Sequence, residues 1–245
     1  MSDSVAIIPT YNESGNINNI LENIQDLSTK FDVIVVDDNS PDGTGKIIKD
    51  FIAKKKFNVN ICLIERKVKD GLGSAYIEGF QKAISLNYKF IFQIDCDGSH
   101  NPKKLVEMKK TLVNDSDIVV GSRYIKGISV LHWPLPRLLL SIFANYYVKF
   151  VTGMKVNDST GGFNGYSRYA LESILKNKIT FQGYAFQIQM KFIGYKLGFK
   201  IKEIPIIFKD REIGESKMSI NIFYEAFFGI FLMKVKSLLF PFKIN

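Results

Sequence analysis

Residues 90–102 read Phe90-Ile-Phe-Gln-Ile-Asp95-Cys-Asp97-Gly-Ser-His-Asn-Pro102, and the rest of the chain is organised around them. An apolar, β-prone run ends there in two carboxylates one residue apart, and Gly, Ser and Pro then turn the chain. Because side chains alternate along a strand, Asp95 and Asp97 would lie on the same side and could share one hard cation. A divalent metal that holds phosphate is the natural hypothesis. The alternative is that both are solvated turn residues, since Asp is common after strands.

The composition indicates a globular chain that attracts anions. With 245 residues and 46% hydrophobic content, it can form one large domain or one domain with an appendage, and we favour the second. The net charge of +9 suits nucleic acid, anionic lipid or a phosphorylated substrate without choosing among them. The two cysteines, Cys62 and Cys96, argue against a disulfide framework and a Cys-based zinc site. The first residues lack the features of a signal peptide, so we expect the catalytic body in the cytosol.

Strand and helix patterns alternate through the first half of the chain, as in a mostly parallel sheet with helices on both faces. The predicted strands are residues 5–9, 32–36, 60–65, 90–94 and 117–121, and helical patterns occupy residues 17–24, 47–52, 73–87 and 102–113. In such sheets ligands bind beyond the carboxyl ends of the strands. The side chains expected to gather there are Tyr11, Glu13, Asp37, Asp38, Asp95, Asp97 and Arg123.

The second half is less regular. We predict a constrained loop at residues 131–137, helices at 138–151 and 184–197, a late strand at 201–208, and a glycine-rich segment at 158–166 whose backbone packs close to a ligand or another segment. Residues 220–240 are almost continuously apolar, but the longest unbroken run, Ala226–Met233, is far shorter than the ~20 residues that span a bilayer. This segment suits an amphipathic helix in the headgroup region, and an ordinary core helix is the alternative.

Several other functions have weak support. Tyr76 replaces the third glycine of a G-x-G-x-x-G fingerprint that begins at Gly71, and His100 and His132 lie in different segments, which does not favour a His-based metal site or triad. Nucleic-acid binding has only the net charge in its favour. A stronger competitor is the nucleophile motif of haloacid-dehalogenase-type phosphatases, which residues 90–99 also resemble. That motif normally opens its fold, whereas three predicted strands come first here.

A set of motifs resembles dolichol-phosphate mannose synthases and their polyprenol-phosphate relatives among inverting family 2 glycosyltransferases. The resemblance covers residues 5 to about 218, and its motifs, in order, are Pro9-Thr-Tyr-Asn-Glu13, Val36–Thr44, Arg66 with Gly71–Ala75, Asp95–Pro102, Gly121–Tyr124, Asp158–Phe163, Gly183–Phe186 and Arg211–Lys217. It implies an α/β GT-A fold with a Rossmann-like, mostly parallel sheet. The corresponding division is a catalytic domain at residues 1–218 and an amphipathic membrane-interface helix and tail at residues 219–245.

The resemblance also implies roles for individual residues. Residues implied to bind the nucleotide sugar are Pro9, Tyr11, Glu13, Val36, Asp38, Asp95, Cys96, Asp97, Arg123, Arg211 and Lys217. Asp95, Asp97 and Ser99 would hold Mg²⁺ or Mn²⁺, and Asp97, Arg123, Arg211 and Lys217 are the catalytic candidates, with Arg137 a weaker one. Since the second pKa of a phosphate monoester is about 6, a lipid phosphate is already an oxyanion near neutral pH, and no general base is required.

The function implied is transfer of mannose from GDP-mannose to a polyprenyl phosphate, at the cytoplasmic face of a membrane to which the protein binds peripherally. A small membrane subunit is a further candidate partner, and nucleic acid is not expected. A UDP-glucose-dependent transferase, the phosphatase and a non-catalytic membrane scaffold are the alternatives. The chain departs from the resembled group at two positions: Gln189 stands where that group usually has Glu, which motivates the scaffold alternative, and Asn164 stands where it often has Arg or Lys. Each removes a charge near the expected acceptor side.

Overall fold

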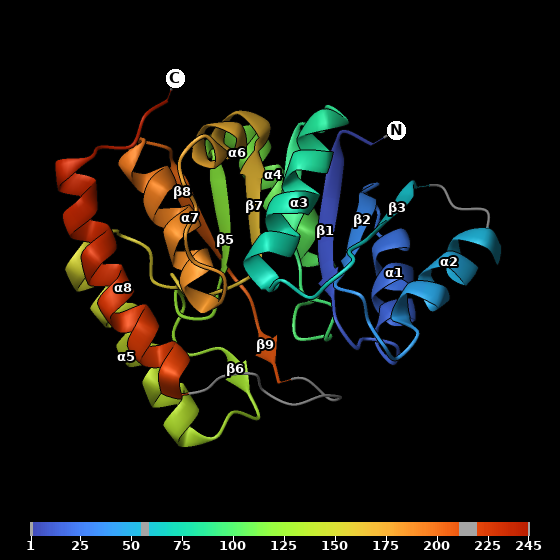
Figure 1. Cartoon of the computed structure of the whole chain (residues 1–245), viewed down its shortest axis with the longest axis horizontal. Helices are drawn as coiled ribbons and strands as arrows, with labels where there is room; N and C mark the ends of the chain where they lie inside the picture. Colours follow the sequence, from blue (N-terminus) through green and yellow to red (C-terminus); the bar gives the residue numbers. More distant parts are fainter. Residues whose placement is uncertain (1, 55–58, 211–219, 245) are drawn as a thin grey trace.

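The computed structural model describes residues 2–54, 59–210 and 220–244. Its centre is a seven-stranded sheet in the order β3-β2-β1-β4-β7-β5-β8 (Figure 1). The strands of this sheet are β1 (Ser4–Thr10), β2 (Asp32–Asp37), β3 (Ile61–Glu65), β4 (Phe90–Gln93), β5 (Ile118–Ser122), β7 (Asn164–Ser167) and β8 (Ile201–Pro205). A small second sheet pairs β6 (Val130–Leu131) with β9 (Phe208–Lys209). The predicted mostly parallel sheet is confirmed.

Strand β1 lies at the centre of the first half of the sheet. It pairs in parallel with β2 and β4, and Ile7 lies opposite Ile34 on one side and Gln93 on the other. Such strands are buried on both faces, which explains why their sequences read as unbroken apolar runs and not as alternating ones. The chain crosses from one side of β1 to the other after β3, so the carboxyl ends of β1 and β4 flank a topological switch point, the usual place for a ligand.

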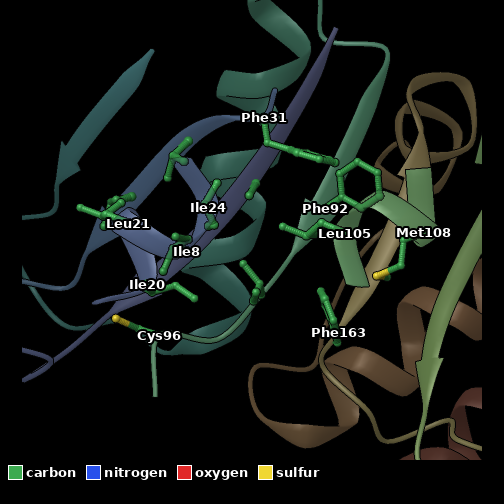
Figure 2. Close-up of a cluster of buried hydrophobic side chains, with 14 of the residues drawn as sticks. Ile8, Ile20, Leu21, Ile24, Phe31, Phe92, Cys96, Leu105, Met108 and Phe163 are labelled. Atoms are coloured by element: carbon green, nitrogen blue, oxygen red, sulfur yellow. The ribbon is translucent and has the colours of Figure 1, made fainter. Parts of the chain in front are cut away.

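The helices cover both faces of the sheet. They are α1 (Ile17–Gln25), α2 (Thr44–Lys54), α3 (Leu72–Ser85), α4 (Lys104–Asp115), α5 (Leu135–Thr152), α6 (Arg168–Leu175), α7 (Tyr184–Lys196) and α8 (Ile220–Leu239). Figure 2 shows one core, in which Ile8 and Phe92 meet apolar residues of α1 and α4. Ile7 points to the opposite face and packs in a second core with α3, α6 and α7. Neighbouring residues of one strand therefore serve different cores.

Strand β7 was not predicted, and it runs antiparallel between β4 and β5. Gly165 makes this insertion possible: a Cβ atom there would lie 2.6 Å from Phe92 Cδ1 and 2.8 Å from Val119 Cγ1, in the two flanking strands. The predicted close packing of the 158–166 backbone is confirmed at this position. Helix α6 and the two-residue strand β6 were also not predicted.

Two boundaries differ from the predictions. The predicted loop at residues 131–137 ends early, because α5 already begins at Leu135. Pro136 allows this start, since proline in the first turn removes only an N–H that has no partner within the helix. The predicted strand at residues 201–208 is divided into β8 and β9, which belong to different sheets.

Helices α5 and α8 lie side by side at one end of the molecule (Figure 1), and α8 also packs against α7. Ile230 and Met233 of α8 are buried there, yet Phe231 and Leu238 on its outer side are more than half exposed. The described part of α8 therefore has buried and exposed apolar side chains together with Lys234 and Lys236, and the predicted amphipathic membrane-interface helix stays a prediction. None of the helices in the described residues is long and apolar enough to span a bilayer.

Candidate active site

The acidic pair lies directly after β4, at the switch point of the sheet. The hydroxyl of the fully buried Tyr76, on α3, donates a hydrogen bond to Asp95 Oδ1 at 2.9 Å. Burial, together with the charge of Asp95, raises the pKa of Tyr76 well above its usual range, so this hydroxyl stays a donor. The backbone N–H of Ser99 donates to Asp97 Oδ1 at 3.1 Å across a turn in which Gly98 has a φ of +74°. The two carboxylates are thus oriented from different elements.

These residues fit a divalent ion. Among the described residues, the Ser99 hydroxyl is one of the buried polar groups without a hydrogen-bond partner, and it adjoins both carboxylates in the chain. No group of three or more His, Cys, Asp and Glu side chains in the described residues could hold a metal alone. Two carboxylates and a hydroxyl instead form the kind of set that shares Mg²⁺ with water and substrate phosphates. Asp95 and Asp97 line one cavity, and the backbone N–H of Ser99 donates to Asp97. The three predicted ligands are chemically suitable, and their shared binding of a metal stays a prediction.

The two carboxylates that end β2 have different partners. Asp37 accepts hydrogen bonds from Thr10 Oγ1 at 2.8 Å and from Ser40 Oγ at 2.6 Å, so it fixes the loops after β1 and β2. Asp38 forms an ion pair with Arg66, and both side chains are nearly buried. Burial raises the pKa of Asp38, and the positive charge of Arg66 opposes that shift. Asp37 thus has a structural role, and the predicted contact of Asp38 with the nucleoside stays a prediction.

The remaining candidates on the nucleoside side divide into two groups. Tyr11 and Glu13 lie in the loop after β1: the ammonium of Lys69 is 3.7 Å from the centre of the Tyr11 ring, and Glu13 Oε2 accepts from Asn16. Pro9 is partly exposed at the end of β1. The side chains of Val36 and Cys96 are instead buried in the two cores, where burial raises the pKa of Cys96 well above its usual range. The predicted role of Val36 and Cys96 in binding the nucleotide sugar stays a prediction.

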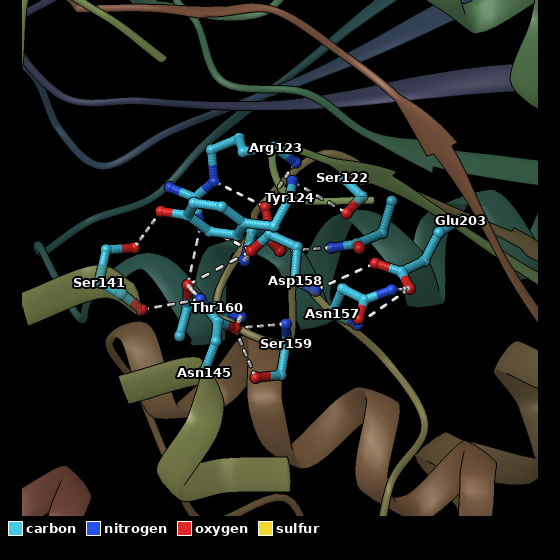
Figure 3. A network of polar contacts seen from close by, with 12 residues as sticks. Ser122, Arg123, Tyr124, Ser141, Asn145, Asn157, Asp158, Ser159, Thr160 and Glu203 are labelled. Atoms are coloured by element: carbon cyan, nitrogen blue, oxygen red, sulfur yellow. Dashed lines mark hydrogen bonds and ion pairs between the residues drawn. The ribbon is translucent and has the colours of Figure 1, made fainter. Parts of the chain in front are cut away.

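Arg123 follows β5 and is held by Asp158 (Figure 3). Its Nε and Nη2 atoms each donate to the Asp158 carboxylate at 2.7 Å, and Nη2 also donates to Thr160 Oγ1 at 2.8 Å. Burial would raise the pKa of Asp158, but the charge of Arg123 and its hydrogen bonds hold the pKa below the ordinary value of 3.8. Asn145 and Glu203 secure the rest of this loop through backbone N–H groups. The guanidinium is therefore fixed before any ligand arrives.

Arg137, on α5, is the second cation of this region. Its Nη1 atom lies 2.9 Å from both carboxylate oxygens of Asp210, and its guanidinium stacks 4.3 Å from the centre of the Trp133 ring. The centre of the same ring lies 5.3 Å from the Arg123 guanidinium, so Trp133 is close to both cations. The sequence did not single out Trp133 for this role. The other predicted cations, Arg211 and Lys217, lie outside the described residues.

A cavity of about 160 Å³ leads from the acidic pair towards α5 and α8. Asp95, Asp97, Arg123 and Arg137 line its polar end. The lining then becomes apolar and includes Leu140, Phe143, Ala144, Val148, Ile188, Ile206, Phe227 and Ile230. The arrangement can hold a molecule with an anionic head and a hydrocarbon tail.

Gln189 and Asn164, the two departures noted in the sequence, do not line this cavity. Gln189 Oε1 accepts hydrogen bonds from the backbone N–H groups of Thr180 and Phe181 at 2.9 and 3.1 Å, and its Nε2 donates to Lys178 O at 3.3 Å. A carboxylate could not make the last of these bonds. Asn164 is completely buried and donates to Gly161 O at 3.1 Å. Gln189 therefore has a structural role that needs no charge.

Comparison with known proteins identifies the family. A model of glycosyl transferase family 2 matches residues 5–175. The chain belongs to glycosyltransferase family 2. It is 37% identical over 227 residues to a polyprenol monophosphomannose synthase of Mycolicibacterium smegmatis, covering 93% of this chain and 85% of that protein. It is 38% identical over 222 residues to an undecaprenyl-phosphate mannosyltransferase of Micrococcus luteus, covering 91% of this chain and 90% of that protein. The protein is thus a glycosyltransferase, and the phosphatase interpretation of residues 90–102 is set aside.

Solved structures agree with this fold. The chain resembles glucosyl-3-phosphoglycerate synthase from Mycobacterium tuberculosis, solved with Mn²⁺, UDP and glucosyl-3-phosphoglycerate, with a TM-score of 0.65 at 14% identity and coverage of 94% of this chain and 79% of that one. It also resembles a mannosyltransferase from Pyrobaculum calidifontis, solved with GDP-mannose and Mn²⁺, with a TM-score of 0.63 at 16% identity and coverage of 98% and 65%. The predicted GT-A fold is confirmed.

Proposed function

We propose that this glycosyltransferase transfers mannose from GDP-mannose to a polyprenyl phosphate, with inversion at the anomeric carbon and with Mg²⁺ or Mn²⁺. The observation that carries the proposal is the cavity, because its polar end adjoins the acidic pair while its apolar part reaches α5 and α8. Such a cavity suits a phosphate on a long hydrocarbon chain better than a soluble sugar acceptor. The two curated relatives, whose names specify polyprenol-type acceptors and mannose, support the same choice.

The mechanism follows from the charges that line the cavity. Bound at Asp95, Asp97 and Ser99, a divalent ion would neutralise the charge that develops on the departing diphosphate. Arg123 and Arg137 would attract and orient the acceptor phosphate, and Arg211 and Lys217 remain further candidates for the same task. Because that phosphate is largely ionised at neutral pH, it can attack without a general base. Positioning and electrostatic stabilisation would then supply most of the rate enhancement.

A donor panel tests the proposed reaction. We expect transfer from GDP-mannose to a short polyprenyl phosphate in detergent, with product detected by mass spectrometry. UDP-glucose, UDP-N-acetylglucosamine and GDP serve as comparison ligands. Transfer from UDP-glucose alone would overturn the choice of donor, and donor binding without any product would favour the non-catalytic scaffold.

We further propose that the exposed apolar sides of α5 and α8 rest on the membrane that supplies the acceptor, at its cytoplasmic face and with or without a small membrane subunit. Exposed apolar side chains on this face are Leu139, Phe143, Tyr146, Phe150, Phe228, Phe231, Leu232 and Leu238. Phe150 is 89% exposed, an unusual position for a large aromatic side chain in a protein surrounded only by water. Burial of this face in the headgroup region would bring the apolar part of the cavity to the lipid.

Vesicle binding tests this membrane contact. The double substitution Phe150→Asp and Phe231→Asp should weaken binding to phospholipid vesicles by about tenfold or more, because it removes two exposed aromatic groups that would insert. Sedimentation with vesicles measures the bound fraction. The matched control is Val113→Asp, since Val113 is 57% exposed but lies on α4. Equal binding by the double variant and the control would contradict the proposal.

A further inference from the structure

Lys191 is a completely buried lysine on α7 that the proposed mechanism does not use. Removing an ammonium group from water costs several kcal/mol unless partners replace the water. Two main-chain oxygens do so: Lys191 Nζ donates to Gly161 O at 2.7 Å and to Ser159 O at 3.2 Å. Both oxygens belong to the segment of residues 158–162, here called the Asp158 loop. Lys191 therefore binds the Asp158 loop to α7.

The opposite side of the Asp158 loop touches the acidic pair. A Cβ atom added to Gly162 would lie 3.3 Å from Asp95 Oδ2, so the glycine backbone packs directly against a predicted metal ligand. Asp158, at the start of the loop, accepts two hydrogen bonds from the Arg123 guanidinium and so fixes its position. A displacement of this loop would consequently move both the surroundings of the metal site and one of the cations that line the cavity.

We propose that Lys191 is a positioning residue, which binds the carbonyl groups of Ser159 and Gly161 and thereby keeps the Asp158 loop in place against Asp95. This inference rests on the proposed function in one respect: its test uses GDP-mannose, the donor that we propose. The carbonyl of Gly161 also accepts from Asn164, the position where the resembled group often has a basic residue. In this chain the positive charge beside that carbonyl comes from α7 instead.

The charge of Lys191 should depend on pH near neutrality. Burial lowers its pKa to about 7, although Asp158 and Glu203 oppose the shift; Arg123 lowers the pKa further. These are the charged groups that face the ammonium from the Asp158 loop, β8 and the end of β5. Below pH 7 the side chain is an ammonium and forms charge-assisted bonds, which are about twice as strong as neutral ones. Above pH 7 it becomes an amine, and its hold on the loop weakens.

The contribution of Lys191 to folding stability should change with pH in the opposite direction from its hold on the Asp158 loop. Since the pKa in the folded protein is below the ordinary lysine value of 10.5, the unfolded chain binds more protons between about pH 7 and 10.5, and the folded state gains stability from this group as the pH rises. The penalty for burying the charge is complete below pH 7. A purely structural lysine would show only this trend, whereas a positioning residue would also make ligand binding weaker as the pH rises.

The experiment compares the wild-type protein with Lys191→Met and Lys191→Arg. The dissociation constant of GDP-mannose is measured by calorimetry with saturating Mn²⁺ at pH 6.0 and pH 8.5, and thermal melts are recorded at both values. We expect Lys191→Met to bind about tenfold more weakly than wild type at pH 6.0 and only about twofold more weakly at pH 8.5. Lys191→Arg, which keeps its charge, should lose less affinity than wild type between pH 6.0 and 8.5.

Two results would overturn the inference. One is a Lys191→Met deficit that is absent or equal at both pH values in a protein with a cooperative melt. The second applies if Lys191→Met does not fold: it is a loss of GDP-mannose affinity between pH 6.0 and 8.5 that is the same in wild type and in Lys191→Arg. Failure of the proposed function looks different: the wild-type protein would then bind UDP-glucose in preference to GDP-mannose, and the same series with UDP-glucose would test Lys191.

Discussion

Replacement of Asp97 by alanine should lower the rate of sugar transfer by about 10²–10³-fold. The reason is electrostatic: in the proposed mechanism, departure of the diphosphate creates negative charge, and Asp97 is one of two carboxylates that would hold a cation to neutralise it. Asp97 follows a strand whose position is fixed by pairing with β1 and β7. Loss of rate should be accompanied by loss of Mn²⁺ binding.

Steady-state transfer from GDP-mannose measures the first effect, and electron paramagnetic resonance of free Mn²⁺ measures the second. Asp115→Ala is the matched control, because Asp115 lies on the surface at the end of α4 and pairs there with Lys200 and Lys202. Chelator should reduce wild-type transfer to the level of the Asp97 variant. Transfer that resists chelator, or an Asp97→Ala enzyme that retains full activity, would show that the carboxylates have another role.

The first half of the fold could be predicted because local patterns and final burial agree there. Helix α1 is one example: Ile17, Ile20, Leu21 and Ile24 recur at helical spacing, and all four are buried. The parallel strands likewise read as apolar runs, since both of their faces are covered. Strand β7 gave no such signal. Its sequence Asn164-Gly-Tyr-Ser167 contains no apolar run, and it forms a strand only because β4 and β5 leave a gap that Gly165 fits.

The acidic pair was predictable because it follows a strand, and Asp95 and Asp97 line one cavity; the part of Asp38 in the site stays a prediction. Asp38, Asp95 and Asp97 were expected together because parallel strands bring their carboxyl ends to one edge. Tyr76 and Lys191 were missed, because their contacts join residues far apart in the chain and no local pattern reveals which partner a helix face will meet. Trp133 was missed because it lies in a loop without a regular pattern. Gly161 and Lys191, for example, are 30 residues apart in sequence.

Removal of the Asp158 carboxylate should cause the largest loss of stability that we predict. Its side chain is completely inaccessible and accepts bonds from Arg123 Nε and Nη2 and from the backbone N–H groups of Arg123 and Gly161. Asp158→Ala would leave a nearly buried guanidinium and two N–H groups without their acceptor. Removing one partner of a buried ion pair typically costs 3–5 kcal/mol, so we expect the free energy of unfolding to fall by about that amount.

Urea denaturation of Asp158→Ala and of the exposed-site control Asp115→Ala measures this loss, and the double variant Arg123→Met/Asp158→Ala separates its causes. If the uncompensated Arg123 charge dominates, the double variant should be more stable than Asp158→Ala alone, because it removes that charge. The pH dependence provides an independent check. Since the pKa of Asp158 is held below 3.8 in the folded protein, its contribution should be complete above about pH 4 and should disappear as the pH falls through the lower folded value. A loss below 1 kcal/mol at pH 7 would mean that water or a neighbouring group replaces the carboxylate, and Arg123 would then not be fixed by Asp158 before a ligand binds.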